Sequence, residues 1–217
     1  MPRYQPPPAP AAPLSGLVLP AGTLLHRVHS TEFAPDAFNP VPAHCLYGGG
    51  RFDSTGCEKY GFLYAGLGPL GALGETLLRP LAFDPAGGPR LLPRTALRDR
   101  AVSRLRTTAD LSLVPLTSAK ELGAVHQDTW LVHAEAPDYP YTRDWAHWIR
   151  RHSGPWAQGL LWPSKRDPAE ECVVLFHDRC PEGLLVVEGD SLRLDTAEGG
   201  AWLDAWLEGL HVRSAPR

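Results

Sequence analysis

The chain has 217 residues, of which 21 are Lys or Arg and 24 are Asp or Glu, so its formal net charge at pH 7 is −3. This balance argues against proteins that bind nucleic acids or anionic membranes, because both classes carry an excess of basic residues. Apolar residues make up 43% of the chain, and no segment approaches the roughly 18 to 20 consecutive apolar residues of a membrane-spanning helix. The length predicts one main domain that is large enough to bury a substantial core.

Glycine and proline are frequent, with 21 and 23 copies. Because proline interrupts helices and both residues favour turns, the composition predicts short strands and short helices. Residues 1–13 are rich in proline and lack the apolar run of a signal peptide, so we expect a disordered arm over residues 1–20 and a cytoplasmic protein. The main domain is expected over residues 21–180, followed by a C-terminal extension over residues 181–217 whose helix packs on that domain.

Hydrophobic periodicity predicts the secondary structure in chain order. The segment 23–29 alternates as a strand with Leu25, Arg27 and His29 on one face, and the proline-rich segment 31–42 is expected to be a loop. A helix is expected to begin at Pro69, where proline suits the first turn, and to end at Pro80. Strands are expected at residues 61–65, 101–107, 111–116, 159–162 and 172–176, and helices at residues 142–152, capped by Thr142, and 196–208.

One short motif predicts a nucleotide-binding turn. Residues 66–71 read GLGPLG, which matches GxGxxG between a strand and a helix, and Asp84 follows. A dinucleotide fold also requires a parallel sheet built from repeated βαβ units, and the later sequence is interrupted by proline and rich in strands. We therefore favour a turn in which glycine lets the helix pack closely on the strand.

The cysteines form no CxxC pair. His44 lies next to Cys45, which leaves open a zinc site with Cys57, but the spacing fits no common zinc finger. The favoured interpretation of Cys45, Cys57, Cys172 and Cys180 is therefore isolated, buried thiols in a reduced protein.

Three polar residues lie in or beside apolar segments, where simple exposure to solvent does not explain them. Arg27 lies in an apolar strand, Glu75 borders the leucine stripe of the first helix, and Tyr64 ends the strand that leads into that helix. A buried charge is costly unless it is paired. The residues alone are equally consistent with a structural Arg27–Glu75 ion pair and with a functional site.

Several sequence blocks occur together in one order. They are LHRV at residues 25–28, GGRF at 49–52, FLYA at 62–65 with Glu75 eleven residues after Tyr64, GLLWPS at 159–164 and CVVLF at 172–176. Together they resemble the RES-domain family, which is named for an Arg, a Glu and a Ser that would fall on Arg27, Glu75 and Ser164. The resemblance spans about residues 24–176, and the chain departs from the family in its Pro-rich arm and in the segment after about residue 179.

The resemblance implies an α+β fold similar to that of ADP-ribosyltransferases, with mostly short strands in a split or sandwiched sheet and short flanking helices. It implies NAD as the substrate, no metal, and service as the toxin of a bacterial toxin–antitoxin pair, with a cognate antitoxin as the protein partner. Nucleic acids and membranes are not expected as partners.

The same resemblance assigns roles to individual residues. Glu75 would stabilise the positive charge that grows on the nicotinamide ribose, and Arg27 and Arg51 would hold the pyrophosphate or a ribose. Tyr64 would stack on the nicotinamide ring, and Ser164 would hydrogen-bond the ribose or the carboxamide. The predicted catalytic residues are thus Glu75, Arg27, Tyr64 and Ser164, and the predicted substrate-binding residues are Arg51, Gly50 and Phe52.

The expected reaction is cleavage of the nicotinamide–ribose bond, by a glycohydrolase with water as acceptor or by a phosphorylase with phosphate. Two alternatives remain open: transfer of ADP-ribose to a macromolecule, and a noncatalytic partner-binding protein on the same fold. A Ser-based hydrolase triad is not supported, since Ser164 does not lie in a GxSxG motif.

Overall fold

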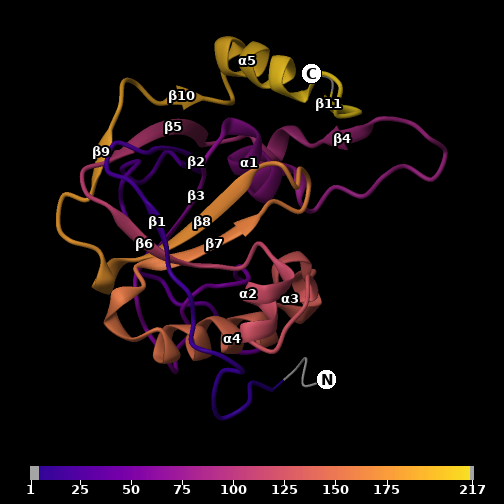
Figure 1. Ribbon diagram of the computed structural model, residues 1–217. Helices are drawn as coiled ribbons and strands as arrows, with labels where there is room; N and C mark the ends of the chain where they lie inside the picture. The colour runs from indigo at the N-terminus through magenta and orange to yellow at the C-terminus, as the bar shows by residue number, and fades with distance from the viewer. Residues whose placement is uncertain (1–4, 216–217) are drawn as a thin grey trace.

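The computed structural model, which describes residues 5–215, contains a nine-stranded mixed sheet (Figure 1). The strand order is β1-β6-β7-β8-β3-β2-β5-β10, and β9 also pairs with β5. Strands β6 and β7 are parallel, whereas the other neighbours are antiparallel. The strands are β1 (Leu17–Leu19), β2 (Leu24–Ser30), β3 (Phe62–Gly66), β5 (Arg100–Thr107), β6 (Leu111–Pro115), β7 (Gly159–Pro163), β8 (Glu171–Phe176), β9 (Leu185–Val187) and β10 (Leu192–Arg193).

The sheet is split between β2 and β3. These strands pair at one register position, His26 opposite Gly66, whereas β2 and β5 pair along all seven residues of β2. The two halves therefore diverge, and apolar side chains such as Leu25, Leu63 and Leu105 fill the space between them. The α+β fold with a split sheet of short strands, expected from the sequence, is confirmed.

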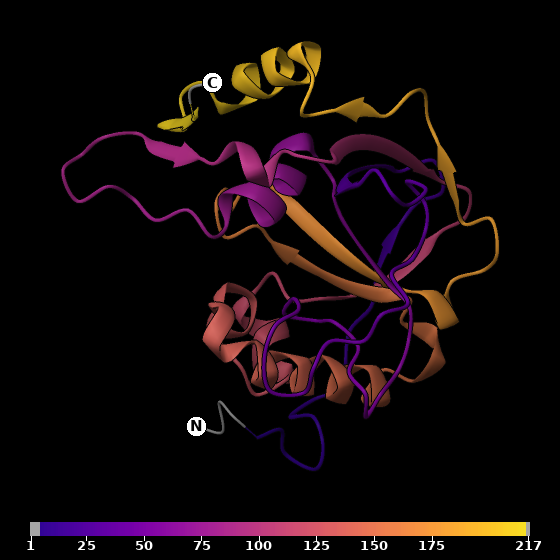
Figure 2. The same cartoon turned by 180° about the vertical axis from the view of Figure 1, so that it is seen from behind.

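Short helices cover both outer faces of the split sheet. In Figures 1 and 2, α5 lies on one side of the sheet and α4 on the opposite side. The helices are α1 (Pro69–Leu73), which continues as a π-helical turn (Gly74–Leu78), α2 (Ala119–Ala124), α3 (Trp130–His133), α4 (Tyr139–His152) and α5 (Ala197–Leu207). A separate parallel pair joins β4 (Arg90–Leu92) to β11 (Val212–Ser214).

Each helical layer has its own apolar core. Trp145, Trp148 and Ile149 of α4 pack on the outer face of the β7–β8 half. On the other side, Leu73 of α1 and Leu203 of α5 belong to the core that covers β2 and β5. The expected burial of these side chains of α4 is therefore confirmed.

The expected start of α4, with Thr142 as its cap, is wrong. Helix α4 begins at Tyr139 rather than at Thr142. Thr142 is a buried interior residue whose hydroxyl donates to Arg51 O (2.8 Å) or, in its other rotation, to Tyr139 O (3.1 Å). The prediction failed because Pro140 suits the first turn of a helix and extends it toward the N-terminus.

The N-terminal arm is ordered where it meets the sheet. The expectation of disorder over residues 1–20 is wrong for β1, which pairs with β6. Further back, Pro7 O accepts a hydrogen bond from Trp148 Nε1 (2.6 Å), and Ala11 N donates to Ala124 O (3.0 Å). Residues 1–4 of the predicted arm lie outside the described residues.

The sheet also continues past residue 180, because β9 and β10 pair with β5. Beyond them, the helix expected over residues 196–208 forms as α5. The sheet itself thus extends into the segment that the sequence predicted to be an extension.

The glycine motif at residues 66–71 serves close packing. The sheet is mixed and mostly antiparallel rather than doubly wound, which contradicts a dinucleotide fold. A Cβ on Gly66 would lie 2.4 Å from Ala72 N, so glycine at this position lets α1 approach β3.

Candidate active site

Glu75 lies in the π-helical turn that continues α1 toward the loop after β7. A π-helical turn carries an extra residue per turn, so it changes the direction of the side chains that follow, and such turns often occur at functional sites. Gly74 permits the approach of this turn to Ser164, because a Cβ there would lie 2.9 Å from Ser164 Oγ.

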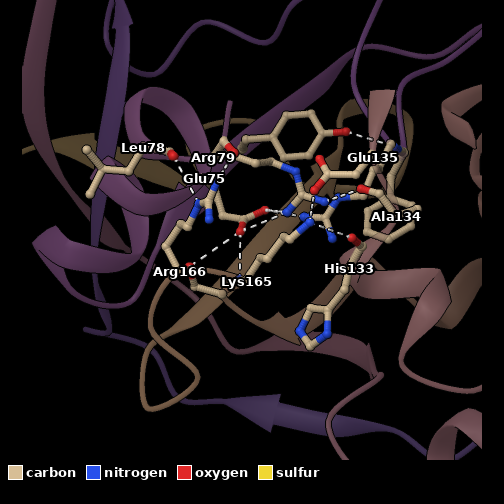
Figure 3. A network of polar contacts seen from close by, with 12 residues as sticks. Glu75, Leu78, Arg79, His133, Ala134, Glu135, Lys165 and Arg166 are labelled. Carbon is tan, nitrogen blue, oxygen red and sulfur yellow. Dashed lines mark hydrogen bonds and ion pairs between the residues drawn. The ribbon is translucent and has the colours of Figure 1, made fainter. Parts of the chain in front are cut away.

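Both oxygens of the Glu75 carboxylate are held by several donors. Arg79 Nη1 lies 3.2 and 3.1 Å from Oε1 and Oε2, and Arg51 Nη2 donates to Oε2. Oε1 also accepts hydrogen bonds from Lys165 N (2.9 Å) and Ser164 Oγ (3.3 Å). Figure 3 shows Glu75 between Arg79 and the backbone of Lys165.

The carboxylate is ionised despite its burial. Its side chain is 12% exposed, and burial alone would raise its pKa. The charges of Arg51 and Arg79 and the hydrogen bond from Lys165 N oppose this effect, and the pKa of Glu75 lies below its ordinary value. The site therefore holds a carboxylate that is negative at neutral pH in a largely water-excluded position.

Arg79 and Lys165 fasten the Glu75 turn to the neighbouring segment at residues 133–139. Arg79 donates from Nε to Tyr139 OH (2.9 Å) and from Nη2 to Ala134 O. Lys165 Nζ donates to His133 O (3.2 Å) and pairs with Glu135 (Figure 3). These contacts connect the two chain segments that flank the carboxylate.

Arg51 lies in the glycine-rich loop at residues 46–56 and contacts Glu75 from there. A buried arginine of α4 holds this loop in place. Arg143 of α4 is fully buried, and its guanidinium donates to Gly48 O (2.7 Å), Gly50 O (3.2 Å) and His44 O (2.9 Å). Gly49 has φ +68° and its Cβ position would lie 2.5 Å from Ala43 Cβ, so this turn requires glycine.

Tyr64 and Asp53 fasten the same loop from the sheet side. Tyr64 OH donates to Asp53 Oδ1 (2.8 Å) and accepts from Phe52 N (2.9 Å), while Gly50 N donates to Asp53 Oδ2 (2.7 Å). Burial raises the pKa of Asp53, although the hydrogen bonds from Gly50 N and Tyr64 OH oppose the shift. Burial likewise raises the pKa of Tyr64 well above its ordinary value, so its hydroxyl stays protonated.

The structure brings together some of the predicted site residues. Arg51 and Ser164 each hydrogen-bond Glu75, and Gly50 and Tyr64 hydrogen-bond Asp53 of the loop that carries Arg51. Phe52 is fully buried and packs edge-to-face on Trp162, with ring centroids 5.0 Å apart. The Phe52 ring is thus part of the core beneath the Arg51 guanidinium, which lies 5.2 Å from its centroid.

Arg27 lies apart from this cluster. Its Nη1 donates to Ala37 O (2.7 Å) and to Pro35 O, which ties β2 to the loop that follows. Burial lowers the pKa of Arg27 to about 10. No hydrogen bond or ion pair joins it to Glu75 among residues 5–215, which excludes the structural alternative of an Arg27–Glu75 ion pair; Glu75 pairs instead with Arg51 and Arg79.

Sequence reasoning missed several residues that build the site. The sequence contained a signal for Arg79: it follows Glu75 by four positions, and an acidic residue and an arginine at that spacing face one another on a helix. Arg143 and Asp53 had none, since each acts through loop carbonyls or hydroxyls that come close only after folding.

Two polar atoms around the carboxylate lack partners within the described part of the chain. They are Arg51 Nη1 and His133 Nε2, both buried. Burial and the positive charges of Arg51 and Arg79 lower the pKa of His133. Both atoms thus have hydrogen-bonding capacity that the described residues do not use.

The cysteines differ from the prediction of isolated, buried thiols. Cys45 and Cys57 are exposed, with their sulfurs 3.7 Å apart, whereas Cys172 is buried. Among residues 5–215, no group of three or more His, Cys, Asp or Glu side chains is arranged to hold a metal ion. Within the same range no helix has the length and apolar character needed to cross a membrane.

Two surface hollows of about 450 and 530 Å³ lie away from the carboxylate. The first lies between the residue 67–68 turn and residues 168–171, and the second lies beside α5 and β11. Because Glu75 already has donors on both oxygens, a ligand that hydrogen-bonds this carboxylate must displace some of them.

Comparison with known proteins identifies a family and a solved structure with a similar fold. Residues 24–197 match the family model of the RES domain. No curated protein sequence matches significantly. The crystal structure of the M. tuberculosis MbcT–MbcA toxin–antitoxin complex contains a chain with a similar fold, at a TM-score of 0.55 and 15% identity, covering 81% of this chain and 85% of that one. Because the family match covers most of its length, the chain belongs to the RES-domain family.

Proposed function

We propose that the protein cleaves the nicotinamide–ribose bond of NAD with Glu75 as the essential catalytic residue. The observation that carries this proposal is a single ionised carboxylate, held between Arg51 and Arg79 and in contact with Ser164. Membership of the RES-domain family supports it further.

One carboxylate is sufficient for this reaction. Nicotinamide leaves NAD as a neutral base from a cationic pyridinium, so no general acid has to protonate the leaving group. Ordinary glycosidases, in contrast, use two carboxyl groups around an oxocarbenium-like transition state. Glu75 would accept hydrogen bonds from ribose hydroxyls and stabilise the positive charge that grows on the sugar, which is the kind of preorganised electrostatic contribution that dominates many enzymes.

The arginines suit the other end of the substrate. A guanidinium binds phosphate oxygens with two parallel hydrogen bonds and remains charged. Arg51 has a buried Nη1 without a partner among the described residues, so it has a donor to offer to the NAD diphosphate or ribose. Contact of Arg27 with the diphosphate and stacking of Tyr64 on nicotinamide remain predictions of the family resemblance.

The test is release of nicotinamide from NAD by the purified protein, followed by chromatography. Glu75→Gln is expected to lower the rate by about 10²-fold to 10³-fold, as removal of one preorganised charge-stabilising group does. The matched control is Glu188→Gln, which removes the carboxylate of an exposed ion pair with Arg106 and should keep the rate. If NAD remains intact in the presence of water, phosphate and cell lysate, the proposal is refuted and a noncatalytic binding protein is favoured.

The acceptor distinguishes hydrolysis or phosphorolysis from ADP-ribosyl transfer. All these reactions use the same carboxylate, so NAD labelled in the adenylate part should yield ADP-ribose, its phosphate ester or a labelled macromolecule. We propose water or phosphate as the acceptor. Label recovered on protein or nucleic acid would support the transferase alternative.

We further propose that the protein acts as a toxin with a cognate antitoxin as partner. Family membership and the fold shared with a chain of a toxin–antitoxin complex support this role. Expression in a bacterial host is expected to deplete NAD and arrest growth, while Glu75→Gln at equal protein level should do neither. Normal growth with full NAD depletion would contradict the toxin role and leave the enzymatic proposal intact.

A further inference from the structure

Two exposed thiols meet at the base of the glycine-rich loop. Cys45 Sγ and Cys57 Sγ are 3.7 Å apart, although twelve positions separate them in the sequence. The intervening segment includes Gly50, which is held by Asp53 and Arg143, and Arg51, which pairs with Glu75. The thiol pair thus closes the loop that carries an arginine of the candidate active site.

Backbone pairing produces this proximity. Ala43 and Thr55 form a parallel bridge, with Ala43 N donating to Ser54 O (2.8 Å). Cys45 lies two residues beyond this bridge, and Cys57 lies in the tight turn between Thr55 and Glu58, whose backbone groups exchange two hydrogen bonds of 3.2 Å.

We propose that Cys45 and Cys57 form a reversible disulfide that restrains the glycine-rich loop at residues 46–56. A disulfide has a sulfur–sulfur distance of about 2.05 Å, so the two sulfurs approach by less than about 2 Å from their present separation. Side-chain rotation accomplishes this movement with the Ala43–Thr55 bridge intact.

The oxidant is a low-molecular-weight disulfide such as oxidised glutathione. The Cys45 thiolate attacks one sulfur of the oxidant, a mixed disulfide forms, and one glutathione thiolate leaves. Cys57 then loses its proton, its sulfur attacks Cys45 Sγ, and the second glutathione thiolate leaves. The protein loses two electrons and two protons, and the oxidant is reduced to two thiols.

Electrostatics favours this order of attack. The hydrogen bond with Cys45 and the negative charge on that sulfur raise the pKa of the Cys57 thiol. Cys57 therefore holds its proton more tightly than an ordinary thiol, which suits it to act second, because the thiolate is the attacking form.

The surroundings disfavour a metal at this pair. A structural zinc site takes four ligands, and no third His, Cys, Asp or Glu joins the two sulfurs among the residues that the structure describes. His44 Nδ1 already accepts a hydrogen bond from Leu46 N (3.1 Å), and its ring stacks on Tyr47 at a centroid distance of 3.7 Å.

The test uses the full chain in mixtures of reduced and oxidised glutathione, with alkylation and peptide mass spectrometry as the readout. We expect an intramolecular Cys45–Cys57 cross-link that reverses completely in dithiothreitol. Cys57→Ser should instead accumulate a mixed glutathione disulfide on Cys45. Absence of the cross-link in excess oxidised glutathione, or cross-links only between copies, would overturn the proposal.

Restraint of the loop is measured separately by amide hydrogen exchange. Exchange over residues 46–56 is expected to slow by about tenfold or more on oxidation, because local opening of the loop becomes less frequent. The variant carrying both Cys45→Ser and Cys57→Ser retains Cys172 and Cys180, and it should show no change under the same oxidant. Unchanged exchange in fully cross-linked protein would refute the restraint.

One consequence rests on the proposed function. The cross-link favours the present loop arrangement, in which Arg51 is engaged with Glu75, so oxidised protein should release nicotinamide at least about threefold more slowly than reduced protein. An equal rate in cross-linked and reduced protein would refute this coupling. Failure of the reduced protein to cleave NAD would refute the proposed function, while the mass and exchange measurements would still test the disulfide.

Discussion

At the scale of single residues, buried arginines position the parts of the candidate site. Arg143 is fully buried, and its charge is distributed over backbone carbonyls rather than neutralised in an ion pair with a carboxylate. Five planar donors allow one guanidinium to bind several carbonyls at once. Because those carbonyls belong to the loop that carries Arg51, a residue of α4 controls where Arg51 meets Glu75.

Arg143→Met is expected to lower the free energy of unfolding by about 2–4 kcal/mol, because carbonyls of the loop lose their buried donor. The measurement is urea unfolding of the variant and the wild type. Arg151→Met is the control on the same helix: its side chain is 58% exposed and pairs with Glu58, so the loss should stay below about 1 kcal/mol. Equal losses in both variants would contradict the assigned role of Arg143.

At the scale of elements, the junction between β3 and α1 positions Glu75. Gly66 ends β3, and the helix that follows packs so closely that Ala72 N would lie 2.4 Å from a Cβ on Gly66. The turn of α1 into π-helical geometry then directs Glu75 toward Ser164. The glycine motif that resembles a nucleotide-binding fingerprint thus acts by packing one helix against the sheet.

Gly66→Ala is expected to destabilise the protein by about 3 kcal/mol or more, since a Cβ there meets backbone atoms that have no rotamer to change. The same substitution at Gly123, inside α2 with open space around its Cβ position, should stabilise by up to about 1 kcal/mol through helix propensity. Thermal or urea unfolding of the two variants measures the difference. If Gly66→Ala leaves the free energy of unfolding unchanged, the junction between β3 and α1 can relax to accommodate a Cβ.

At the scale of the whole molecule, the fold keeps several histidines neutral. Burial lowers the pKa values of His26 and His29 on β2, of His133 at the end of α3 and of His147 on α4. The His29 ring contacts Ser30 O (2.8 Å) and Ser103 Oγ (2.7 Å). Protonation of these rings therefore favours the unfolded chain.

Stability is expected to fall as the pH drops below about 6.5, the ordinary histidine pKa. In that range the unfolded chain binds protons that the folded protein does not. Each such histidine removes up to about 1.4 kcal/mol of unfolding free energy per pH unit until the pH reaches its folded-state pKa. Urea unfolding at about pH 7.5 and about pH 5.5 measures the effect, and His29→Gln should make the difference smaller. An unchanged difference in His29→Gln would exclude a contribution from His29.

Much of the site was predictable because short-range patterns and family blocks carry it. Period-2 alternation predicted β2 and β5, short apolar runs predicted β3 and β8, and helical spacing predicted α1 and α5, because each pattern reflects which faces of an element are buried. The order of the sequence blocks predicted Arg51, Glu75 and Ser164, which the structure brings into contact.

The sequence by itself determined the fold class, the family resemblance and the candidate carboxylate, since these depend on local periodicity and on blocks that can be read along the chain. Only the tertiary structure decided that Glu75 pairs with Arg51 and Arg79 rather than with Arg27, and that Cys45 meets Cys57. Ion pairs and thiol contacts depend on distances of a few ångströms between segments. Those distances are set by how the split sheet, α4 and the glycine-rich loop pack, which no single segment encodes.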